Sequence, residues 1–140
     1  MQTSRNAVSD GTEKARLFGI TAVVVPGILA PLILPHVSPS TVYHAVLHIA
    51  STTIAVFISI VSLIAYSRNA RARMALMMLG FMSLVAVELF YLLSASGLAM
   101  PFLIPAVNIE LPHVILLAML GLFGLGVLKV NKSHEDIRQK

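Results

Sequence analysis

Long runs of apolar residues alternate with short polar segments along this chain of 140 residues. About 20 apolar residues in a helix cross the roughly 30 Å hydrocarbon layer of a membrane. Four runs have about this length, and they occupy residues 17–35, 43–66, 74–96 and 111–128. The pattern predicts an all-α fold, an integral membrane four-helix bundle, as a single domain over residues 1–140. The segments 1–16 and 131–140 are polar, and we predict tails that are too short to fold alone.

Composition supports a membrane protein. The chain is 57% hydrophobic and 11% charged, whereas a soluble domain carries about 25% charged residues. We therefore expect the lipid bilayer to be its main surroundings and the cell membrane to be its location. The sequence contains no cysteine, which excludes disulfide bonds, thiolate metal ligands and iron–sulfur clusters.

The positions of the lysines and arginines along the chain predict the topology. All ten lie before the first run, between the second and third, or after the fourth: Arg5, Lys14, Arg16, Arg68, Arg71, Arg73, Lys129, Lys132, Arg138 and Lys140. The connections 36–42 and 97–110 contain none. Because cytoplasmic loops collect Lys and Arg, both termini are predicted to be cytoplasmic and both connections external. The net charge of +4 follows from this bias and does not indicate a nucleic-acid partner.

The second apolar run places its small and polar residues on one side. At 3.6 residues per turn these residues share one face of a helix: His44, His48, Ser51, Thr52, Ala55, Ser59 and Ser62. The opposite side consists of Val, Ile and Phe. Small residues let membrane helices approach closely, and hydroxyls bond across the interface. We therefore expect this face to point toward neighbouring helices.

Glu88 is the one acidic residue deep within an apolar run. An ionisable group in hydrocarbon costs about 2.5–3.5 kcal/mol, so Glu88 should be protonated, paired or bound to a cation. A helix rises about 1.5 Å per residue, which places His48 roughly 8 Å and Glu88 roughly 12 Å below the outer helix ends. His44 lies one turn above His48, and His113 begins the fourth run. We predict that these four side chains meet in the outer third of the protein.

This set of side chains favours a metal site. His44 and His48 have i, i+4 spacing, so both imidazoles leave one helix face and can bind one ion. Histidines with a carboxylate and without cysteine suit Cu²⁺, Zn²⁺ or non-haem iron. We predict His44, His48, Glu88 and His113 as ligands of Cu or Zn, with Glu110 as an additional ligand. A haem b held between His48 and His113 is an alternative.

The functional prediction is a metal-binding or redox-associated accessory subunit that works with other membrane protein subunits or as a homo-oligomer. Two alternatives remain open. One is a non-catalytic structural or sensory subunit whose polar residues only order the helices. The other is a small proton-coupled transporter. The sequence contains no nucleotide-binding loop, hydrolase elbow or H-E-x-x-H motif, so no catalytic residue is assigned.

Overall fold

A computed structural model describes the backbone of residues 2–98, 103–104 and 109–138, and the side chains of residues 11–98, 103 and 109–126. The all-α prediction is confirmed, because four helices make up most of the described chain. A 3₁₀ turn follows the first helix, and two short antiparallel strands precede the last. The elements are α1 (Gln2–Ile33), η1 (Leu34–His36), α2 (Val42–Arg68), α3 (Ala72–Ala95), β1 (Leu103–Ile104), β2 (Ile109–Glu110) and α4 (Leu111–Arg138).

Within the described residues, three helices are long and apolar enough to cross a membrane. They are Gly11–His36, Val42–Arg68 and Ala72–Ala95, with mean hydropathy of 2.4, 2.1 and 2.1. The apolar stretch of α4 within the described side chains, Leu111–Gly126, is shorter. The fourth span therefore stays a prediction.

The polar segments near the two ends of the chain are continuous with helices α1 and α4. The backbone of α1 is helical from Gln2, and that of α4 remains helical to Arg138. Extending an existing helix adds one hydrogen bond per residue without the cost of nucleation. The described backbone of residues 2–16 and 131–138 is therefore part of α1 and α4.

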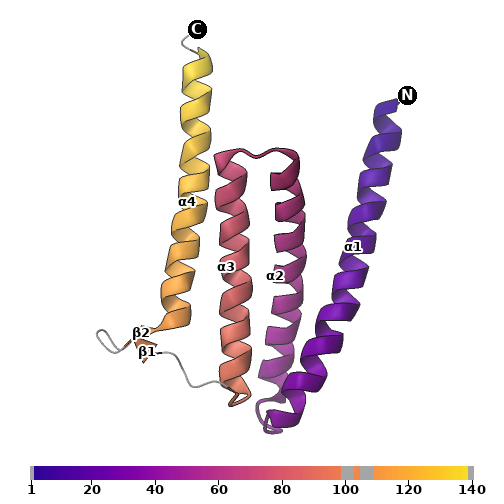
Figure 1. The fold of residues 1–140 in the computed structure, drawn as a ribbon, viewed down its shortest axis with the longest axis vertical. Helices are drawn as coiled ribbons and strands as arrows, with labels where there is room; N and C mark the ends of the chain where they lie inside the picture. Colours follow the sequence, from indigo (N-terminus) through magenta and orange to yellow (C-terminus); the bar gives the residue numbers. More distant parts are fainter. Residues whose placement is uncertain (1, 99–102, 105–108, 139–140) are drawn as a thin grey trace.

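The helices lie in a row in chain order, each antiparallel to the next (Figure 1). Among the described residues, the main helix–helix contacts join α1 to α2, α2 to α3 and α3 to α4. This arrangement differs from a closed bundle, in which the first and last helices would also pack together. In a lipid bilayer, where lipid tails are as apolar as leucine side chains, no hydrophobic force would require such a row to close.

The core lies near the turn between α1 and α2. Ile33, Ala45, Ile49 and Leu92 pack together there, and each is at most 6% exposed. They come from α1, α2 and α3, so the second helix is held between its two neighbours. This contact fixes the beginning of α2, which carries the histidines.

The central position of α2 explains which of its residues are buried. Thr52 and Ala55 belong to the predicted polar face and are buried as expected. Ala45, Ile49 and Thr53 lie outside that face and are buried as well. A helix between two neighbours buries two sides, whereas the sequence pattern predicted one.

The chain ends and the α2–α3 turn lie at one end of the row, and the α1–α2 turn and the β1–β2 pair lie at the other (Figure 1). Among the described side chains, the first end carries Lys14, Arg16, Arg68, Arg71 and Arg73. The second end carries histidines and Glu110. The fold therefore separates the two groups as the sequence predicted, and the side of the membrane on which each end lies stays a prediction.

Candidate functional site

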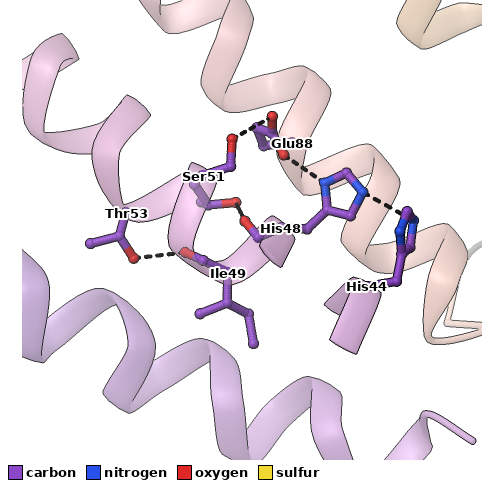
Figure 2. Close-up of polar contacts among 7 residues, drawn as sticks. His44, His48, Ile49, Ser51, Thr53 and Glu88 are labelled. Atoms are coloured by element: carbon purple, nitrogen blue, oxygen red, sulfur yellow. Dashed lines mark hydrogen bonds and ion pairs between the residues drawn. The ribbon is translucent and has the colours of Figure 1, made fainter. Parts of the chain in front are cut away.

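Three of the predicted site residues form one hydrogen-bonded chain between α2 and α3 (Figure 2). His48 Nδ1 lies 2.7 Å from Glu88 Oε2. Ser51 Oγ donates to the other carboxylate oxygen, Oε1, over 2.7 Å. At the far side of the imidazole, His48 Nε2 lies 3.1 Å from His44 Nε2. Both oxygens of Glu88 and both ring nitrogens of His48 therefore have partners.

These contacts define the tautomers when the carboxylate is ionised and both imidazoles are neutral. Glu88 then accepts the Nδ1–H of His48, because a carboxylate has no proton to donate. The Nε2 of His48 consequently carries a lone pair and accepts the Nε2–H of His44. The lone pair of His48 Nε2 therefore points toward His44.

The chain of hydrogen bonds runs from the surface into the protein. His44 is exposed, whereas the side chains of His48 and Glu88 are 18% and 13% exposed. Helical spacing explains the arrangement. His44, His48 and Ser51 follow one another at intervals of four and three along α2, so they share one face, and that face meets Glu88 on α3.

Aromatic contacts fix the ring of His48. The ring of Tyr91 stacks on it, with centroids 5.3 Å apart and planes inclined by 24°. The ring of His44 meets it edge-on, with centroids 4.5 Å apart. Tyr91 lies three residues after Glu88, so both leave the same face of α3. The imidazole of His48 is thus held by the carboxylate at one edge and by the phenol ring on one face.

The structure does not bring His113 to this cluster. His113 Nδ1 lies 3.5 Å from Glu110 Oε2, and the two side chains are 59% and 48% exposed. Within the described part of the chain, no group of three or more His, Cys, Asp or Glu side chains is arranged to hold a metal. The physical reason is the order of the helices. Since α3 lies between α2 and α4 (Figure 1), His48 and His113 do not face each other as a pair of haem ligands would.

Ser51 and Tyr91 are the two residues of the site that the sequence prediction did not include among the site residues. Ser51 was expected on the polar face of the second apolar run, but its hydroxyl was not assigned to Glu88. Tyr91 lies one turn from Glu88 in the sequence, and this spacing was the available signal. Helical periodicity indicates that such residues share a face, but it does not say which side chain on a neighbouring helix each one meets.

Comparison with protein-family models, curated proteins and solved structures finds no significant match to this chain. The contacts described above join five residues into one cluster, hereafter the His–Glu cluster: His44, His48, Ser51, Glu88 and Tyr91.

Proposed function

We propose that the protein spans the cell membrane four times, with both termini in the cytoplasm, and binds Cu²⁺ or Zn²⁺ through His44 and His48 near the external face. The membrane location is supported by three helices of suitable length and hydropathy. The orientation is supported by the positive charge at the end of the row that contains both chain ends, because Lys and Arg collect in cytoplasmic segments.

The distance between the two imidazoles is the observation that carries the metal proposal. The Nε2 atoms of His44 and His48 are 3.1 Å apart. Two nitrogens bound tetrahedrally to Zn²⁺, each at about 2.05 Å, lie about 3.3 Å from each other. The pair therefore needs to separate by only a few tenths of an ångström to bind an ion. An ion bound between the two Nε2 atoms would require neutral His44 to carry its ring proton on Nδ1 in place of Nε2.

Glu88 contributes to this proposed site by holding His48. Metal-binding histidines commonly donate their second N–H to a carboxylate, which fixes the tautomer and the ring orientation. The 2.7 Å contact from His48 Nδ1 to Glu88 Oε2 has this form. The carboxylate also places a negative charge close to the proposed cation. Glu88 then acts through His48, whereas the sequence prediction made it a direct ligand.

Two imidazoles leave coordination positions to be filled. Protein zinc sites normally contain three or four protein ligands. The remaining ligands would come from water, from a second copy of the chain or from another membrane protein subunit. The exposure of His44 gives such a partner access to the ion. This favours an accessory subunit of a membrane complex or a homo-oligomer over a monomer that acts alone.

Thermal unfolding in mild detergent tests the metal proposal. Binding to the folded form alone stabilises it by about 2.7 kcal/mol at a hundredfold excess over Kd. Cu²⁺ or Zn²⁺ should therefore raise the melting temperature of the wild type, and a chelator should reverse the rise. His48→Ala should abolish the effect, whereas His36→Ala should keep it, because His36 is an exposed histidine that bonds to the backbone of Leu32. A rise of equal size in His48→Ala would refute the proposal.

The same geometry supports proton exchange as a second candidate function. Hydrogen bonds connect exposed His44 through His48 to the half-buried carboxylate of Glu88. A neutral imidazole can accept a proton on one nitrogen and release one from the other. This series of hydrogen bonds can therefore carry a proton from His44 to Glu88. Proton uptake by reconstituted vesicles, monitored with a pH-sensitive dye, separates this function from metal binding. Uptake in the wild type that is lost in Glu88→Gln would support it. If the protein neither binds metal nor takes up protons, the cluster has a structural role only.

A further inference from the structure

A cavity of about 490 Å³ lies between α1 and α2, toward the end of the row opposite the His–Glu cluster. The two helices pack together near η1, and α1 leans away from α2 toward the chain's N-terminus (Figure 1). Seven residues line the cavity: Glu13, Lys14, Leu17, Val61, Ile64, Ala65 and Arg68. Its walls therefore come from the first half of α1 and the last two turns of α2.

The lining changes from charged to apolar along the helices. Lys14 and Arg68 belong to the end of the row that carries the positive charges, whereas Leu17, Val61 and Ala65 lie farther along toward the middle of the row. The distance from Arg68 to Val61 along α2 is roughly 10 Å, at about 1.5 Å per residue. Beyond this depth, Phe18 of α1 meets Phe57 of α2 edge-on, with ring centroids 5.1 Å apart. The two helices are thus in contact beyond the apolar end of the cavity.

We propose that this cavity binds an anionic phospholipid, with its phosphate at Lys14 and Arg68 and the first part of its acyl chains between α1 and α2. Charge complementarity supports this occupant. The rim carries two positive side chains, Lys14 and Arg68, and one negative side chain, Glu13. Arg binds phosphate oxygens through two parallel N–H groups, and Lys binds them as a point charge.

The apolar walls of the cavity favour a lipid over free phosphate as the occupant. A soluble anion would use Lys14 and Arg68 but would leave Leu17, Val61 and Ile64 facing water. A phospholipid covers both the charged rim and the apolar walls, because its own polarity changes over the same short distance. Basic pockets between membrane helices on the cytoplasmic side are suited to anionic headgroups. The inference uses the membrane location of the proposed function, and it is independent of the metal site.

Native mass spectrometry of the full-length protein in neutral detergent tests the inference. After titration with phosphatidylglycerol or phosphatidylcholine, the wild type should retain phosphatidylglycerol preferentially. Lys14→Gln combined with Arg68→Gln should lower this retention by about thirtyfold. Arg71→Gln combined with Arg73→Gln is the matched control, since it removes the same charge from the same end outside the cavity. The control variant should retain phosphatidylglycerol as the wild type does.

A cavity-filling variant tests the apolar part of the site. Ala65→Trp keeps both basic side chains and places an indole in the cavity, so it should also lower phosphatidylglycerol retention. Inorganic phosphate, added as the soluble probe, should not displace the lipid. Equal retention of the two lipids by the wild type, equal losses in the two double variants, unchanged retention in Ala65→Trp, or displacement by phosphate would each overturn the inference. Loss of metal binding in His48→Ala would leave lipid retention unchanged, so the two proposals fail separately.

Discussion

Ser51 Oγ donates a 2.7 Å hydrogen bond to Glu88 Oε1, the carboxylate oxygen that His48 does not contact. The bond joins α2 to α3 within their apolar interiors. A half-buried carboxylate needs donors for its oxygens, because burial removes the water that would otherwise solvate them. Ser51 and His48 together supply these donors. Glu88 therefore has a hydrogen-bond donor for each of its oxygens, and the Nε2 of His48 is directed toward His44.

We predict that Ser51→Ala lowers the free energy of unfolding by about 1–2 kcal/mol, because one oxygen of Glu88 loses its hydrogen-bond donor. Denaturant titration in mild detergent measures this change. Ser83→Ala is the control, since the hydroxyl of Ser83 bonds only to the carbonyl of Leu79 in its own helix. A loss in Ser51→Ala no greater than that in Ser83→Ala would contradict the role given to Ser51.

Glu88→Gln should fold and bind metal weakly. The carbonyl of the new amide can still accept the Nδ1–H of His48, but the negative charge near the ion is lost. Substitution of such carboxylate partners typically weakens metal affinity by about 10–100-fold. Calorimetric titration with Cu²⁺ or Zn²⁺ measures the affinity, with Glu110→Gln as a control that removes an exposed carboxylate. Unchanged affinity in Glu88→Gln would remove Glu88 from the proposed site.

Gly80 allows the close approach of α3 and α4. A Cβ atom at this position would lie 2.6 Å from Cε1 of Phe123. Gly80→Ala should therefore lower the free energy of unfolding by about 1–3 kcal/mol, as overpacking does elsewhere. Gly121→Ala is the matched control, because a Cβ there meets nothing within 4 Å. Thermal unfolding of the two variants should differ, and Phe123→Leu should partly restore Gly80→Ala. Equal stability of the two alanine variants would mean that α3 and α4 pack differently.

Reporter fusions test the orientation in the membrane. A reporter placed after Ser67 and one placed after Lys140 should both be active as cytoplasmic fusions, because the neighbouring segments carry the positive charges. A reporter inserted in the 36–42 connection should give the external signal. An external signal from either of the first two fusions would rule out four spans with both termini inside.

The sequence predicted the helices and most of the His–Glu cluster for clear physical reasons. Apolar runs of sufficient length define helices in a membrane-like chain, and helical periodicity places His44 and His48 on one face. Depth estimates then placed Glu88 at their level, and the structure brings these three residues together. The shared face of His44 and His48 depends on spacing within one helix. The matching depth of Glu88 depends on neighbouring helices being antiparallel.

The position of His113, apart from the His–Glu cluster, has a different origin. His113 lies at the expected end of α4, but α3 separates α4 from α2. Depth and periodicity carry no information on whether four helices close into a bundle or stay in a row. The β1–β2 pairing of Leu103 with Glu110 was also not predicted, because the proline-containing connection shows no alternating pattern.

Elemental analysis of the purified protein measures whether His44 and His48 bind Cu²⁺ or Zn²⁺. The protein is loaded with Cu²⁺ or Zn²⁺, separated from free ions by gel filtration in detergent, and compared with the His44→Ala/His48→Ala double variant. We expect bound metal in the wild type and in His36→Ala, and only background in the double variant. Metal content in the double variant equal to that of the wild type, or no bound metal in the wild type, would contradict this expectation.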